Sequence, residues 1–176
     1  MIFRPTKLAG AVVIEPEPLT DERGFFARTF SRDEFITAGL DGDVSQCSIS
    51  FNAARGTLRG LHYQAEPYAE AKLVRCTQGA IYDVIVDLRP KSPTFCEWVA
   101  VELSATNRLE LFVPKGFAHG FQTISAASEV YYQISVPYEA GAARGVRWND
   151  ARFAIVWPPA ERIISARDKA FPDFVA

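Results

Sequence analysis

The sequence predicts an all-β fold, a jelly-roll sandwich or barrel with one or two short helices. Three observations support this prediction. Short segments of alternating apolar and polar residues recur along the chain, Gly, Pro and Asn separate them, and only one segment carries clear helix signals. With 176 residues, 48% of them hydrophobic, the chain is long enough for one sizeable core and short for two. We therefore expect a single domain over residues 1–176.

Strands are expected where β-branched and aromatic residues lie between turn signals. The expected strands cover residues 11–16, 25–30, 45–51, 57–64, 72–78, 81–88, 95–103, 108–113, 118–124 and 129–136. Within 81–88, the two-residue period of a strand places Asp83 and Asp87 on the same face. The sequence thus predicts two carboxylates that point in one direction.

Helix signals are concentrated between the second and third expected strands. Ser31 and Glu34 have the spacing of a capping box, and Gly39 is a C-terminal stop signal. A second short helical turn is expected to start at Ser165. Both helices are therefore expected to be short.

Composition excludes several classes of protein. Lys and Arg number 19 against 21 Asp and Glu, so the net charge of -2 favours no nucleic-acid partner, although a few cations can still bind a diphosphate. No apolar run approaches the roughly 20 residues that cross a membrane, and no secretory leader is expected in residues 1–10. Cys47, Cys76 and Cys96 show no CxxC spacing, so we expect a cytoplasmic chain with free thiols and no membrane partner.

The two histidines lie in unusual segments. His62 lies in 58–64 and His119 in 114–121. The strand period places Leu58 and His62 on one face and Arg59 on the other, unless Gly60 marks a bulge. A lone histidine is more often a hydrogen-bonded packing residue, but nearby cations favour a site that receives an anion. These cations are Arg59, Lys72, Arg75 and Lys115.

The segment Pro114-x-Gly116-x-x-His119 resembles the second half of the cupin signature. The first half normally supplies two metal-binding histidines separated by one residue, and then a glutamate. Here His62 is the only histidine of that pair, and Glu66 or Glu70 is the available carboxylate. Such a set is poor for a transition metal, so we expect a cupin scaffold without metal. No P-loop, dinucleotide fingerprint or GxSxG motif is present.

The chain resembles the dTDP-4-dehydrorhamnose 3,5-epimerase family over nearly its whole length. The resemblance rests on the segments 21–26, 58–64, 72–75, 83–84, 86–89, 92–95, 102–105, 113–121 and 148–150. It implies a cupin jelly roll without cofactor, and a homodimer in which N-terminal segments help complete the neighbouring site. It implies inversion of C3 and C5, the carbons beside the ketone of a nucleotide-linked 4-keto-6-deoxy sugar.

The resemblance also implies roles for individual residues. His62 matches the general base, Asp168 its paired carboxylate, Tyr132 the acid on the opposite face of the sugar, and Lys72 the lysine near the keto oxygen. The positions implied to contact substrate are Arg23, Gln46, Ser48, Arg59, His119 and Arg167.

These residue types suit the chemistry of a carbon beside a ketone. Histidine titrates near neutral pH and can remove the proton. A carboxylate fixes the tautomer of the imidazole and stabilises the imidazolium. A cation such as Lys72 stabilises the enolate oxygen, and a tyrosine hydroxyl such as Tyr132 can return a proton to the other face.

Several positions depart from the family pattern. Arg28 and Ala143 stand where the family often has glutamate, Cys47 interrupts a Gln-Asp-Asn motif, and Gln133 replaces a lysine. These positions concern recognition of the nucleotide, so the sequence leaves the base and the exact sugar open.

Other functions remain compatible with the sequence. Within the same chemistry they are a mono-epimerase acting at C3 or C5 and a 3,4-ketoisomerase. Outside it they are a metal-dependent cupin such as a dioxygenase and a non-catalytic sugar-nucleotide-binding cupin. The missing second histidine argues against the metal enzyme, and the joint presence of His62, Lys72, Tyr132 and Asp168 argues against the non-catalytic protein.

Overall fold

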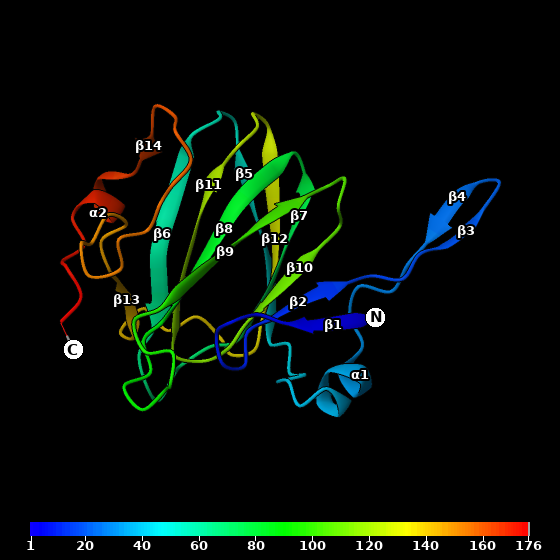
Figure 1. Cartoon of the computed structure of the whole chain (residues 1–176), viewed down its shortest axis with the longest axis horizontal. Coiled ribbons are helices and arrows are strands. Elements are labelled where there is room, and N and C mark those ends of the chain that lie inside the picture. Colours follow the sequence, from blue (N-terminus) through cyan, green and yellow to red (C-terminus); the bar gives the residue numbers. More distant parts are fainter. Residues whose placement is uncertain (176) are drawn as a thin grey trace.

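The computed structural model describes residues 1–175, and it consists of two antiparallel sheets packed face to face (Figure 1). Sheet I contains, in spatial order, β1 (Ile2–Pro5), β2 (Val12–Glu15), β10 (Glu110–Val113), β7 (Lys72–Gln78), β12 (Ser128–Ile134) and β5 (Gln46–Asn52). Sheet II contains β13 (Ala143–Gly145), β6 (Thr57–Gln64), β11 (Phe117–Thr123), β8 (Ala80–Asp87) and β9 (Trp98–Ser104). The short β14 (Ile163–Ile164) pairs in parallel with β6. The predicted all-β sandwich is confirmed.

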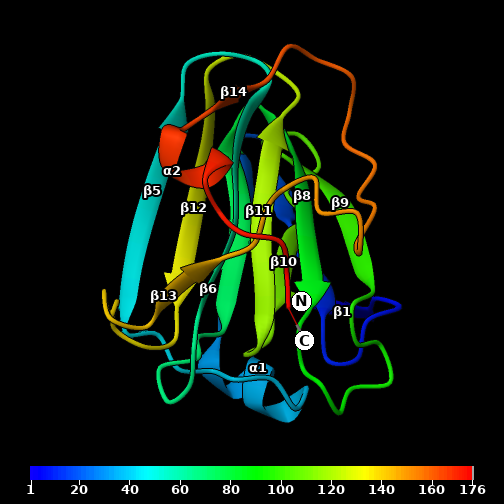
Figure 2. The same ribbon diagram turned by 90° about the vertical axis from the view of Figure 1, so that its left-hand side faces the viewer.

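Each sheet alternates its side chains between an inner and an outer face, which the strand period requires. In β8, Ile81 and Ile85 enter the core between the sheets, whereas Val84 and Val86 pack on the outer side. Asp83 and Asp87 alternate in step with Ile81 and Ile85, so they share the inner face of β8, as predicted. The C-terminal segment runs across the outer side of sheet II (Figure 2) and covers it with aromatic residues such as Trp157.

The two helices are short, as expected. In α1 (Arg32–Thr37), Ser31 makes no side-chain capping bond, so the predicted capping box is wrong. Glu34 binds the Met1 ammonium at 3.1 Å and Arg28 at 3.3 Å, and its carboxylate is therefore engaged elsewhere. Gly39, at φ +76°, ends the helix as predicted. No helix in the described part of the chain is long and apolar enough to cross a membrane.

The second helix, α2 (Ala166–Lys169), follows Ser165 as expected. The Ser165 hydroxyl accepts a hydrogen bond from the Asp168 amide at 3.0 Å. This N-cap holds the first turn, and the helix contacts β6 through Asp168. The cap therefore positions a predicted site residue.

An N-terminal hairpin stands away from the sandwich (Figure 1). It is formed by β3 (Leu19–Asp21) and β4 (Gly24–Phe26). The strand expected over 25–30 ends at Phe26, because its partner strand has only three residues. Leu19, Phe25 and Phe26 are exposed on this hairpin, which we call the arm.

Strand β6 contains an irregularity that reverses its faces. Its register with β11 shifts between the His119–His62 pair and the Phe121–Arg59 pair. Leu58 and Leu61 consequently pack in the outer cluster, while Arg59 and His62 both face the interior. The expectation that Leu58 and His62 share a face is wrong, and the bulge at Gly60, left open by the sequence, explains why.

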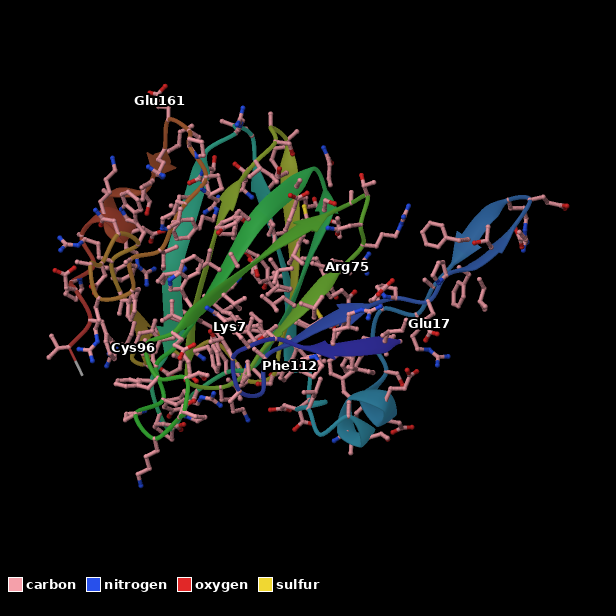
Figure 3. All side chains as sticks on the ribbon, viewed as in Figure 1. Lys7, Glu17, Arg75, Cys96, Phe112 and Glu161 are labelled. Carbon is pink, nitrogen blue, oxygen red and sulfur yellow. The ribbon has the colours of Figure 1, made fainter. Side chains whose placement is uncertain are left out.

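The outer side of sheet I carries a buried acidic residue. Glu110 on β10 is fully buried, and its Oε1 lies 3.3 Å from Arg75 Nη1 on β7. Arg75 lies on the side of the sandwich nearest the arm (Figure 3), where it lines a small hollow together with Phe25. Burial raises the pKa of Glu110 to about 8, against a smaller opposing effect of Arg75.

Candidate active site

A cavity of about 320 Å³ opens between the two sheets. Most of the predicted site residues line it, and they are Gln46, Ser48, Arg59, His62, Lys72, His119 and Tyr132. They come from both walls, since β5, β7 and β12 belong to sheet I and β6 and β11 to sheet II. The structure therefore brings together residues that lie up to 86 positions apart, from Gln46 to Tyr132.

His62 and Asp168 form a close pair on the sheet II side of the cavity. His62 Nε2 lies 2.9 Å from Asp168 Oδ1, and Asp168 Oδ2 accepts the Gly60 amide at 3.1 Å. Burial by itself raises the pKa of the Asp168 carboxyl, but the hydrogen bonds from His62 and Gly60 outweigh it and hold that pKa below its usual value. An ionised Asp168 fixes the proton of His62 on Nε2, which leaves Nδ1 able to accept one.

Tyr132 lies on the opposite wall. Strand alternation sends Tyr132 into the cavity, as expected, and directs Tyr131 to the outer side of sheet I. Burial, with a further contribution from the negative Asp83, raises the pKa of Tyr132 far above its usual value. Tyr132 is therefore protonated at neutral pH and able to donate.

Lys72 opens β7 on the same wall as Tyr132. Its backbone pairs with Ile134 of β12, and its side chain enters the cavity. Lys72 Nζ lies 2.8 Å from Glu70 Oε1, and each of these side chains is only 10% exposed. A buried ammonium is thus present in the cavity, balanced by one carboxylate.

His119 pairs with a second aspartate, deeper in the molecule. His119 Nε2 lies 2.8 Å from Asp83 Oδ1, and both residues are buried. The His119 ring also meets Tyr132 edge to face, with 6.1 Å between ring centroids. Asp83 therefore orients one histidine as Asp168 orients the other. No three His, Cys, Asp or Glu side chains within residues 1–175 are grouped as a metal site.

Two predicted substrate-contacting arginines, Arg59 and Arg167, lie in or beside the cavity. Arg59 lines it and donates to Asn52 Oδ1 at 2.8 Å. Arg167 lines an adjoining hollow of about 160 Å³ that also touches His62 and Ala143.

Arg23 is the predicted site residue that the structure does not bring to the cavity. It lies in the turn of the arm, is 84% exposed and pairs with Asp21.

Sequence reasoning missed Tyr138 and the pairing of Asp83 with His119, and it named Glu70 only as a possible metal ligand. Glu70 had a signal, because residues two apart in an extended segment share a face and Lys72 follows at that distance. Tyr138 lies after β12 in an irregular loop, and no sequence signal indicated its place in the site. The pairing of Asp83 with His119 depends on the register of β8 and β11, which the sequence does not contain.

Comparison with known proteins identifies the family. The family model described as dTDP-4-dehydrorhamnose 3,5-epimerase matches residues 5–175. A relative of that name from Sinorhizobium fredii is 42% identical over 173 residues, covering 98% of this chain and 89% of the relative.

Solved structures agree over the full fold. The dTDP-4-dehydrorhamnose 3,5-epimerase of Elizabethkingia anophelis superposes with a TM-score of 0.96 at 39% identity, covering 99% of this chain and 96% of that one. The enzyme from Bacillus anthracis, solved with TDP and PPi bound, gives a TM-score of 0.95 at 43% identity, covering 98% of this chain and 99% of that one. The chain therefore belongs to the dTDP-4-dehydrorhamnose 3,5-epimerase family, as its sequence motifs predicted.

Proposed function

We propose that this enzyme inverts C3 and C5, the carbons beside the ketone of a dTDP-linked 4-keto-6-deoxy sugar, by proton transfer alone. The observation that carries the proposal is the placement of His62, backed by Asp168, on one wall of the cavity and Tyr132 on the other. A sugar ring between these walls would expose one face to a base and the other to an acid.

In the proposed first step, His62 Nδ1 removes the proton from the carbon beside the ketone. The C–H electron pair forms the carbon–carbon double bond of an enolate, and the carbonyl pair moves onto oxygen. Asp168, 2.9 Å from Nε2, stabilises the imidazolium that results. His62 is 40% exposed, so its proton can return to solvent between steps.

In the proposed second step, Tyr132 donates its hydroxyl proton to the same carbon from the opposite wall. The raised pKa of Tyr132 keeps the hydroxyl protonated until a strongly basic enolate is present. Lys72 would stabilise the negative charge on the enolate oxygen, a contribution comparable to that of an oxyanion-hole donor. Tyr132 then regains a proton from solvent through the open cavity, and repetition at the second carbon completes the 3,5-epimerisation.

Substrate binding is assigned to the polar edge of the cavity. Arg59 and Arg167 carry the positive charge that a diphosphate requires, and His119, Gln46 and Ser48 offer hydrogen-bonding groups. We further propose a homodimer in which Arg23 serves the cavity of a second copy, because the arm carries it away from its own sandwich (Figure 1). Three free cysteines among the described residues support a cytoplasmic location.

Incubation of the enzyme with dTDP-4-keto-6-deoxyglucose in deuterated water tests the proposal. NMR should show deuterium at both C3 and C5, because each inversion replaces a carbon-bound proton with one from solvent. Exchange at one carbon would instead indicate a mono-epimerase, and absence of exchange would refute the proposal. His62→Ala should abolish exchange at both carbons without changing the circular dichroism spectrum, because His62 is the proposed base for both inversions.

Titration calorimetry tests the nucleotide separately. Arg28, on the segment that follows the arm, pairs with Glu34 at 3.3 Å, and Ala143 lines the hollow beside His62. If dTDP is the natural nucleotide, it should bind far more tightly than GDP, CDP and UDP. Equal affinities would refute the dTDP assignment and would leave the proposed proton chemistry intact.

A further inference from the structure

In the described part of the chain, Glu70 is the one carboxylate that lines the cavity beside a cation and binds neither histidine. Its Oε1 lies 2.8 Å from Lys72 Nζ, and both side chains are 10% exposed. Asp168 and Asp83, in contrast, are engaged with His62 and His119. The proposed chemistry leaves Glu70 without a function.

The backbone around Glu70 is held firmly. Ala69 and Ala71 on either side are buried, so the alternation of an extended segment directs Glu70 to the same side as Lys72. Ala71 donates its amide to Ser135 Oγ at 2.9 Å, and Ser135 donates its amide to the Ala71 carbonyl at 3.0 Å. The Gln64 side chain also donates to the carbonyl of Tyr68 at 3.1 Å. The carboxylate is therefore presented from a fixed loop.

We infer that Glu70 is a positioning residue that holds the Lys72 ammonium against the ketone. Lysine carries its charge on a flexible four-carbon stem, and the bound diphosphate offers that charge a stronger attraction than a neutral carbonyl does. A fixed carboxylate 2.8 Å from Nζ restrains the ammonium. Because the enolate oxygen develops charge only during the reaction, the restraint acts on the rate and not on the affinity for substrate. This inference rests on the function proposed above for Lys72.

The inference makes a kinetic prediction. Glu70→Ala should lower kcat by roughly 10- to 100-fold, the order of loss caused by a displacement of about 1 Å in a catalytic group. KM should stay the same, because the restraint acts on the rate and not on the affinity for substrate. Glu70→Gln keeps an oxygen acceptor and should recover part of the rate. Glu66→Gln removes an exposed carboxylate from the same loop and serves as the matched control, with unchanged kinetics.

A double-mutant cycle tests whether Glu70 acts through Lys72. Glu70→Ala should change kcat less than about twofold when added to Lys72→Met, because the group that it positions is gone. Independent, multiplicative losses would overturn the inference while leaving the proposed role of Lys72 intact. An unchanged kcat in Lys72→Met would overturn both. If Glu70→Ala does not fold, the near-isosteric Glu70→Gln gives the same cycle with smaller effects.

Discussion

Replacement of Asp168 by Asn tests whether the negative charge of Asp168 enables His62 to act as the base. The substitution keeps size and removes the negative charge 2.9 Å from His62 Nε2. The Gly60 amide, 3.1 Å from Oδ2, will retain the amide oxygen of Asn as its acceptor. The NH₂ group then faces His62 Nε2 and requires it to be an acceptor, so the ring proton moves to Nδ1, the atom that must act as base.

The size of the loss follows from the same distances. Two unit charges 2.9 Å apart interact by about 6 kcal/mol at an effective dielectric constant of about 20. His62 is 40% exposed, and solvent screening reduces this to about 3 kcal/mol, or roughly 100-fold in rate. The wrong tautomer adds to the loss, and the corresponding change in a serine-protease triad costs about 10⁴ in kcat. We expect kcat to fall by about 10³ with KM little changed.

The assay is the rate of deuterium incorporation at C3 and C5, followed by NMR under saturating substrate. Asp173→Asn is the matched control, because Asp173 is an exposed carboxylate of the same C-terminal segment, paired with Arg147. Its exchange rate should equal that of the unmodified enzyme. Retention of more than a tenth of the exchange rate by Asp168→Asn would refute the assignment of the pair.

Two further predictions concern Tyr132 and Glu110. Tyr132→Phe should reduce formation of epimerised product about 100-fold, the usual contribution of a general acid, while deuterium exchange at the substrate carbon falls less than about tenfold; equal losses in both would contradict a role on the opposite face. Burial raises the pKa of Glu110 to about 8 from 4.5, so the folded state holds this proton after the unfolded state has lost it. The contribution of Glu110 to stability is therefore fully present below pH 4.5 and is lost as the pH rises through about 8. Urea unfolding should therefore show a decline in the free energy of unfolding across that window, and Glu110→Gln should remove part of this decline; an unaltered pH profile would argue that Glu110 is already ionised.

The sequence predicted the fold well because its signals were local. Alternation defined most strands, and Gly39 and Ser165 carried recognisable helix-end signals. Strand β3 of the arm was not predicted and β4 was predicted too long, since strands of three residues give too little alternation to define. Glu34 failed as a capping residue because the Met1 ammonium, 33 positions away, competes for its carboxylate.

The site was predictable only in part from the residues alone. Alternation placed Asp83 on an inner face, but its contact with His119 depends on strand register. Asp168 lies 106 positions from His62, and only the resemblance to a family connected them. The contacts that make a site from these residues are long-range, and a single sequence carries no record of them.

The bulge at Gly60 leaves almost no room for a change at this point of the chain. Gly60 has φ +128°, and a methyl group there would stand 2.6 Å from the Gly120 Cα on the neighbouring strand. At Gly120, in turn, a methyl group would stand 2.6 Å from the Arg59 carbonyl oxygen. The pair of hydrogen atoms that separates these two backbones thus sets how closely the strands bearing His62 and His119 approach. One added carbon on either glycine would wedge these two paired strands apart and displace His62 and His119 within their wall of the cavity.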